Sequence, residues 1–280
     1  MLRYFPHSVY LRNQVAHGSY QAQEYDVAVD WFKNLLKTDP YRYENLDLYS
    51  NILYIKENFG ELANLAYNVF DNDKYRPETC CTVGNYYSLR GDHHKAVIYF
   101  QRAIRLDKKY LSAWTLMGHE YLEMKNTNAA IESYRTAVDI DDNDFRAWYG
   151  LGQAYELNQI YAFASHYYAQ AALAKPQDSR MWAALANCYE RLDKHDEAIK
   201  CTQRAERVKD KEAIALHKLA KLYAVRGEDD KAAQCFRDNL MRLDKENLNT
   251  NETLEALRFL THYYKQRDEP QMAQQYEIRL

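Results

Sequence analysis

The sequence reads WTLMGHEY at residues 114–121, WYGLGQAY at 148–155 and WAALANCY at 182–189. Tryptophan, a small residue and tyrosine recur in phase in these segments, each of which starts 34 residues after the one before. A fixed period of this length is typical of a protein built from stacked copies of one supersecondary unit. The repeat therefore decides the fold class.

The same register continues along most of the chain. Seven repeats follow one another without insertion, and an eighth resumes after an extra stretch; they begin at Val9, Tyr43, Pro77, Leu111, Phe145, Ser179, Ala213 and near Leu254. Repeat position 8 is always small, with Ala16, Ser50, Gly84, Gly118, Gly152, Ala186, Ala220 and Thr261. Two helices can cross closely at such a position, where a larger side chain would cost ~1 to 3 kcal/mol.

Within each repeat, apolar residues are spaced by three and four, which predicts a helix A over about positions 1 to 14 and a helix B over about 17 to 30. Gly91 and Gly227 fall between these two helices. We therefore predict an all-α fold, a right-handed superhelical solenoid of tetratricopeptide (TPR) helix pairs. Each pair is expected to lean on its neighbours, because one pair cannot bury its apolar face alone.

The register divides the chain into four parts. We expect residues 1–8 to be the end of a truncated preceding repeat, 9–246 seven tandem 34-residue TPR repeats, 247–253 an inserted loop, and 254–280 an eighth, truncated repeat. Thr253 is a candidate cap for the helix after the loop. Because both ends fall within a repeat, we expect the chain to be a piece of a longer solenoid.

Composition excludes several classes of function. The net charge of -3 shows no basic excess, so we expect neither nucleic acid nor a membrane surface as a partner. The sequence has no apolar run long enough to span a membrane and no secretory signal. Its five cysteines lack CxxC spacing and are expected to be reduced packing residues. These features predict a protein of the nucleus and cytoplasm.

The concave face of the solenoid is the candidate binding surface. It is formed by positions 2, 5, 9, 12 and 13 of each helix A, which share one face at 3.6 residues per turn. Side-chain amides on this face can hold the backbone of an extended peptide, and they are Asn85, Gln153 and Asn187. Carboxylates at or beside it can pair with an arginine, and they are Glu120, Glu123 and Glu156. The alternative is that these carboxylates form a solvated helix face.

No motif points to catalysis, a metal or a cofactor. His119 and Glu123 are four residues apart, but a metal site needs further ligands and none stands nearby in the sequence. The serine-hydrolase, phosphate-loop and dinucleotide-binding signatures are absent. Trp114, Trp148 and Trp182 recur at repeat position 4, which favours core packing over an aromatic binding box. We therefore expect no enzyme activity.

Segments outside the repeat consensus add a specific resemblance. The chain contains FPHSVY from Phe5, TCC followed by GNYYSLR in the third repeat, AWTLMGHEYLEMKNT in the fourth and RAWYGLGQAYE in the fifth. In these segments it resembles the subunit 8 family of the anaphase-promoting complex, the cell-division-cycle 23 homologues. The resemblance implies a non-catalytic scaffold of a RING-type ubiquitin ligase active in mitotic exit. It also implies other subunits of that complex as partners.

The resemblance further implies a ligand and its site. Family members bind an extended coactivator segment, the C box, whose motif contains isoleucine and arginine, with an asparagine and a glutamate of consecutive repeats; these match Asn85 in GNYY and Glu120 in GHEY. Five neighbours are added from their groove positions: Leu89, Thr115, His119, Glu123 and Gln153. Family members form homodimers through further N-terminal repeats, so we do not carry dimerisation over to this chain.

Two other classes of function remain open. A chaperone-type TPR adaptor that clamps a C-terminal carboxylate needs lysines on the groove, yet position 5 of the central repeats holds Cys81, Thr115, Tyr149 and Ala183. The chain can also be the substrate-guiding array of a glycosyltransferase or another enzyme whose catalytic domain lies elsewhere. Binding of a chaperone C-terminal peptide, or turnover of donor and acceptor substrates, would identify these classes.

Overall fold

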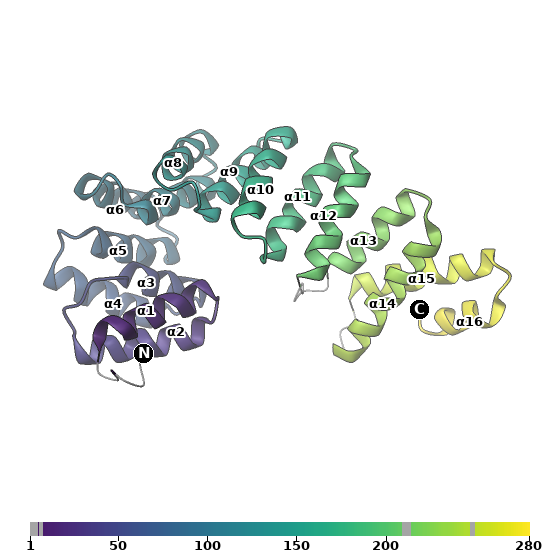
Figure 1. Cartoon of the computed structure of the whole chain (residues 1–280), viewed down its shortest axis with the longest axis horizontal. Helices are drawn as coiled ribbons and strands as arrows, with labels where there is room; N and C mark the ends of the chain where they lie inside the picture. Colours follow the sequence, from purple (N-terminus) through teal and green to yellow (C-terminus); the bar gives the residue numbers. More distant parts are fainter. Residues whose placement is uncertain (1–4, 6–7, 209–213, 247–249) are drawn as a thin grey trace. The chain divides into compact units, whose positions relative to one another are not determined.

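The structure is a computed structural model that describes residues 5, 8–208, 214–246 and 250–280. The described residues form α-helices joined by short turns and no β-strand (Figure 1). The fold divides into an N-terminal half, Met1–Asp142, and a C-terminal half, Asn143–Leu280, which we describe separately. The predicted all-α fold of helix pairs is confirmed.

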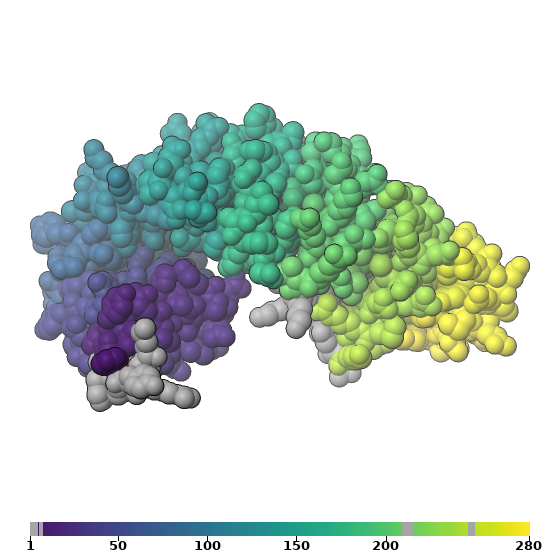
Figure 2. Space-filling view, in the orientation of Figure 1, coloured from purple at the N-terminus to yellow at the C-terminus, as the bar shows by residue number. Residues whose placement is uncertain are grey.

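The helices follow the predicted register. In the N-terminal half they are α1 (Val9–Gln21), α2 (Tyr25–Thr38), α3 (Leu46–Ile55), α4 (Phe59–Asn72), α5 (Pro77–Leu89), α6 (His93–Leu106), α7 (Leu111–Glu123) and α8 (Thr127–Ile140). In the C-terminal half they are α9 (Phe145–Leu157), α10 (Tyr161–Ala174), α11 (Ser179–Arg191), α12 (His195–Arg207), α13 (Ile214–Val225), α14 (Asp229–Glu246), α15 (Asn251–Gln266) and α16 (Pro270–Ile278). Odd-numbered helices are helix A of a repeat and even-numbered helices are helix B. Within each half, successive pairs lie beside one another, as the order of colours shows (Figure 2).

The start of the last repeat differs from the prediction. Helix α15 begins at Asn251, so the end of the expected 247–253 loop is helical; residues 247–249 lie outside the described residues. The N-cap is Thr250, whereas Thr253 stands in the first turn and its hydroxyl oxygen accepts the Thr250 N–H at 3.1 Å. This reciprocal capping box explains why the helix starts three residues early.

Every repeat makes the same turn between its two helices. Repeat position 15 has a left-handed backbone, which suits glycine at Gly91 (φ 82°) and Gly227 (φ 79°). Six other residues adopt the same conformation with φ between 53° and 63°: Gln23, Glu57, Lys125, Gln159, Asp193 and Asp268. The N–H after the turn bonds to a carbonyl of the last turn of helix A, for example Asp92 to Tyr87 at 2.9 Å. The spacing of the helix pair is thus fixed locally.

The small residue at position 8 is required by an aromatic ring of helix B. A Cβ added at Gly118 would lie 2.6 Å from the Tyr134 ring, and one added at Gly152 would lie 2.5 Å from the Tyr168 ring. Both rings are fully buried. The close crossing predicted from the sequence is therefore present in both halves of the chain.

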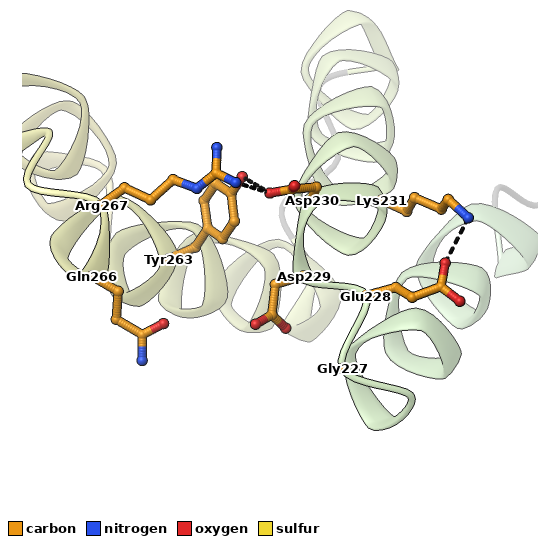
Figure 3. Close-up of a pocket in the computed structure, with 8 residues that line it drawn as sticks. All are labelled: Gly227, Glu228, Asp229, Asp230, Lys231, Tyr263, Gln266 and Arg267. Carbon is orange, nitrogen blue, oxygen red and sulfur yellow. Dashed lines mark hydrogen bonds and ion pairs between the residues drawn. The ribbon is translucent and has the colours of Figure 1, made fainter.

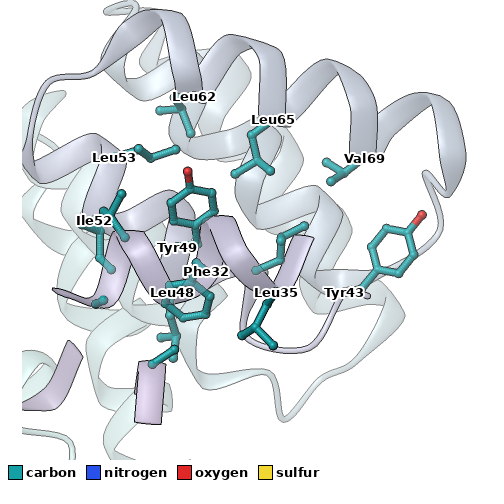
Figure 4. Close-up of a cluster of buried hydrophobic side chains, with 14 residues drawn as sticks. Phe32, Leu35, Tyr43, Leu48, Tyr49, Ile52, Leu53, Leu62, Leu65 and Val69 are labelled. Atoms are coloured by element: carbon teal, nitrogen blue, oxygen red, sulfur yellow. The ribbon is translucent and has the colours of Figure 1, made fainter. Parts of the chain in front are cut away.

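Each half has its own apolar core between the helix layers. In the N-terminal half, Phe32 of α2 stacks on Tyr49 of α3 with ring centroids 5.4 Å apart, and Leu62 of α4 closes the same cluster (Figure 4). In the C-terminal half, Tyr168 and Leu185 belong to one such cluster. None of the described helices combines the length and apolar character needed to cross a membrane.

Candidate peptide-binding site

Two A helices of the N-terminal half, α5 and α7, carry most of the predicted site residues. Helix α5 packs against both α3 and α7, so the second, third and fourth repeats are in contact through their A helices. Asn85 comes from α5 and Glu120 from α7. The site is therefore built on helices, whose mutual packing holds its side chains in place.

Asn85 links the second repeat to the third. Its side chain is 2 % exposed, and its Nδ2 donates to Ser50 Oγ at 2.8 Å and to Asn51 Oδ1 at 2.6 Å. Asn51 and Asn85 occupy the same position of consecutive repeats. The amide is thus already hydrogen-bonded within the chain and held in one orientation.

Glu120 links the third repeat to the fourth. It is 4 % exposed, and its two carboxylate oxygens are each held by a donor: Ser88 Oγ donates to Oε1 at 2.6 Å, and His93 Nδ1 lies 2.8 Å from Oε2. Ser88 stands in α5, and His93 is the first residue of α6. The carboxylate is fixed by donors on two different helices.

The other predicted residues of this half lie on the same two helices and differ in their contacts and exposure. Thr115 is buried and its hydroxyl donates to the Leu111 carbonyl at 3.2 Å. His119 Nδ1 and the Tyr134 hydroxyl lie 2.7 Å apart, with the two rings edge to face. Leu89 is half-buried against the apolar core, whereas Glu123 is exposed.

Gln153 belongs to α9 of the C-terminal half and is half-buried there. The structure thus places Asn85, Glu120 and four of the other predicted residues on α5 and α7, two helices in contact, while Gln153 is described only within its own half. Among the described residues, no group of three or more histidine, cysteine or acidic side chains is arranged to hold a metal ion, His119 and Glu123 included.

The wall next to Asn85 is acidic. Asp47 of α3 is buried, and together with Glu78 of α5 it lies near Tyr110, which precedes α7. Burial raises the pKa of the Glu78 carboxyl, and the charge of Asp47 adds to this. Burial and then the charge of Asp47 also raise the pKa of the Tyr110 hydroxyl, which hydrogen-bonds to that carboxylate. A basic ligand is electrostatically favoured along this wall.

His93 is the contributor that sequence reasoning missed. It is the first residue of helix α6, directly after the turn that ends at Asp92. One signal was present in the sequence. Repeat position 10 is Gly18, Ile52, Tyr86, Ala154, Cys188 and Leu222 in other repeats, but Glu120 in the fourth. A carboxylate at a position occupied elsewhere by uncharged residues calls for donors from neighbouring helices.

A pocket of about 510 Å³ in the C-terminal half is separate from the predicted site (Figure 3). It lies between the turn before α14 and the end of α15. Five of its polar side chains are paired with one another: Tyr263 donates to Asp230 at 2.6 Å, Arg267 also bonds to Asp230, and Lys231 bonds to Glu228 at 2.6 Å. A ligand would have to compete with these bonds, and none of the predicted site residues lines this pocket.

Known proteins place the chain among TPR proteins. It is 59 % identical over 125 residues to "Anaphase-promoting complex subunit 8" of Arabidopsis thaliana and 50 % identical over 125 residues to the Dictyostelium discoideum protein of that name. It is 46 % identical over 129 residues to "Anaphase-promoting complex subunit CDC23" of Saccharomyces cerevisiae. These matches cover 45 %, 45 % and 46 % of this chain but 22 %, 21 % and 21 % of the relatives, so the matched region spans about a fifth of their length.

Solved structures agree with the fold. The crystal structure of the anaphase-promoting complex hetero-tetramer Cut9-Hcn1 matches with a TM-score of 0.69 at 17 % identity, over 95 % of this chain and 51 % of that one. The crystal structure of MamA matches with a TM-score of 0.55 at 22 % identity, over 59 % of this chain and 96 % of that one. The fold is therefore shared with known helix-pair proteins.

The resemblance to the subunit 8 family of the anaphase-promoting complex is confirmed by these relatives. A family model described as the cilia and flagella-associated protein 70 C-terminal domain matches residues 56–277. That range is more than half of the chain and covers helices from α4 to α16. The chain therefore belongs to this TPR family, the cilia and flagella-associated protein 70 C-terminal domain family.

Proposed function

We propose that the chain is the repeat region of a non-catalytic scaffold subunit of the anaphase-promoting complex. In this proposal it binds the Ile/Arg-containing C box of a coactivator along helices α3, α5 and α7, and its other partners are subunits of the same complex in the nucleus and cytoplasm. The observation that supports this most strongly is the buried carboxylate of Glu120, which is held by Ser88 and His93.

The chemistry of the site suits a basic, extended segment. A carboxylate oxygen has two lone-pair sites, and Ser88 and His93 each use one, so both oxygens keep capacity for a further donor. Asp47 and Glu78 add negative charge nearby, while Asn85 and Asn51 supply amides for a peptide backbone. A charge-assisted bond to arginine in such a water-poor site is stronger than one at the surface.

The chaperone-type alternative receives less support. Clamping a C-terminal carboxylate needs unpaired cations on helix A. In the C-terminal half, Lys218 pairs with Glu190 at 3.4 Å and Lys221 pairs with Glu255 at 2.5 Å. An anionic ligand would have to break these ion pairs before it gained its own.

The test is binding of a fluorescent C-box peptide, followed by anisotropy, to the wild-type chain and to Glu120→Gln. We expect this variant to lose at least about tenfold in affinity, since hydrogen bonds to charged groups contribute about 1.5 to 3 kcal/mol. Glu132→Gln is the matched control, because this substitution removes the same charge from an exposed residue of α8. Equal affinity of all three proteins would reject the site, and no binding to wild type would reject the function.

A further inference from the structure

His93 is the more exposed member of its pair with Glu120. The Glu120 side chain is 6 % exposed, whereas that of His93 is 33 % exposed. A ligand in solvent therefore reaches the imidazole more readily than the carboxylate. The remaining side-chain contact of the carboxylate, Ser88, is itself buried and lies on α5.

The bond to Glu120 fixes which nitrogen of His93 carries the proton. An ionised carboxylate can only accept hydrogen bonds, so Nδ1 must donate to Oε2. In the neutral ring the second nitrogen, Nε2, is then an acceptor. Nε2 is not buried, and within the described residues it has no hydrogen-bond partner.

The local structure holds the backbone at His93 in place and leaves its ring to Glu120. His93 is the first residue of α6, whose N-cap Asp92 accepts the Lys95 N–H at 3.4 Å. The Asp92 carboxylate also pairs with Lys95 at 2.8 Å and is thereby occupied. The positive end of the α6 helix dipole lies beside Glu120 and favours its negative charge. A carboxylate behind an imidazole also makes the outer nitrogen a stronger acceptor.

We propose that His93 is a specificity-determining residue of the peptide site, and that its Nε2 accepts a hydrogen bond from the guanidinium of the ligand arginine while Glu120 supplies the charge from behind. This inference rests on the proposed function and deepens it. The ligand class is an arginine-bearing extended peptide. The acid and the imidazole act as one unit: Glu120 orients the imidazole and carries the charge, and His93 adds a further acceptor for the guanidinium.

The test distinguishes the role of Nδ1 of His93 from that of Nε2. In His93→Asn, the side-chain amide nitrogen takes the place of Nδ1 and can still donate to Glu120, but the outer acceptor is lost. We expect this variant to bind the arginine peptide about tenfold more weakly, and to bind a peptide with that arginine replaced by alanine as well as wild type does. His94→Asn is the matched control, since His94 is the exposed neighbour in the same helical turn.

The nitrogen-15 chemical shifts of the His93 imidazole give a second readout. They would not change on ligand binding if His93 had only a structural role. We expect the Nδ1–H form in the free chain and a shift of Nε2 when the arginine peptide, but not the alanine peptide, is added. Equal losses for both peptides, or no loss in His93→Asn, would overturn the inference. If Glu120→Gln still lost affinity in that case, the proposed function would stand; if wild type bound no peptide, both would fall.

Discussion

The two halves of the chain place the same residue types at the same repeat positions and use them differently. His93 of the third repeat and His195 of the sixth are both the first residue of helix B. The repeat after His93 carries Glu120 at position 10. The repeat after His195 carries Leu222 at that position. His93 is hydrogen-bonded through Nδ1, whereas Nδ1 of His195 is buried and has no partner among the described residues.

The amides show the same contrast. Asn85 donates to Ser50 and Asn51, while Oδ1 of Asn187, at the same position of the sixth repeat, is buried without a partner in the described part of the chain. The helix pairs and their turns are alike in both halves. The N-terminal half is therefore the candidate site because Glu120 of one repeat meets His93 of the repeat before it. The helix pairs, which are alike in both halves, only position these residues.

The largest expected effect tests the close crossing of helices A and B, which both halves share. Gly118→Ala and Gly152→Ala should each destabilise the chain by about 2 to 3 kcal/mol, because the new methyl group would meet the Tyr134 or Tyr168 ring at 2.6 or 2.5 Å. Denaturant titration followed by circular dichroism measures this. Gly60→Ala is the control, since nothing lies within 4 Å of a Cβ there. Similar stability of Gly118→Ala and Gly60→Ala would show that the crossing is looser than described.

A second change makes the N-terminal half resemble the C-terminal one. Glu120→Leu reproduces the residue found at Leu222, and it leaves the Ser88 hydroxyl and His93 Nδ1 without their acceptor. We expect a loss of about 2 kcal/mol in unfolding free energy, since an orphaned buried donor costs about 1 to 3 kcal/mol. Binding of the arginine peptide should be lost as well. Unchanged stability and binding would mean that the acid is not coupled to its neighbours.

A third change relieves an unpaired group in the C-terminal half. Asn239 of α14 is fully buried with neither side-chain polar atom bonded within the described residues. Four other repeats have a buried alanine at this position: Ala103, Ala137, Ala171 and Ala205. We expect Asn239→Ala to stabilise the chain by about 1 kcal/mol, because it removes an unsatisfied amide.

Asn68→Ala is the control for that experiment. Asn68 is exposed in the middle of α4, so its replacement measures the gain in helix propensity alone, about 0.5 kcal/mol. A stability gain no greater than that of Asn68→Ala would show that the buried amide of Asn239 is satisfied in solution.

The smallest expected effect is a transplant of the acid. In Leu222→Glu, a carboxylate at repeat position 10 should be able to accept from His195 Nδ1, as Glu120 does from His93. A double-mutant cycle with His195→Phe should give a coupling of about 0.5 to 1 kcal/mol, although burying the acid is itself destabilising. Zero coupling would mean that the equivalent positions do not meet in the C-terminal half.

The sequence was sufficient to predict the helix pairs and the places where they cross closely. The 34-residue period predicted the helix pairs, and the small residues at Gly118 and Gly152 predicted the close crossings, because these features are local and repeated. The start of α15 was missed, since Thr250 and Thr253 are both good caps and only their mutual hydrogen bond selects the first.

The site was predictable only in part. Helix periodicity placed Asn85 on the groove face and Glu120 at its edge, and the resemblance to a known family singled out both. The contacts of Glu120 with Ser88 and His93 span 32 and 27 residues. Such pairings depend on how one repeat packs on the next, which a single helical wheel does not contain.

The most direct test of the central claim is to map where the ligand arginine lies. A C-box peptide with a photoreactive group beside its arginine can be cross-linked to the full chain, and the adducts located by mass spectrometry. We expect adducts on α5 (Pro77–Leu89), on the first turn of α6 and on α7 (Leu111–Glu123). Adducts confined to α13 (Ile214–Val225) and α15 (Asn251–Gln266) would contradict it.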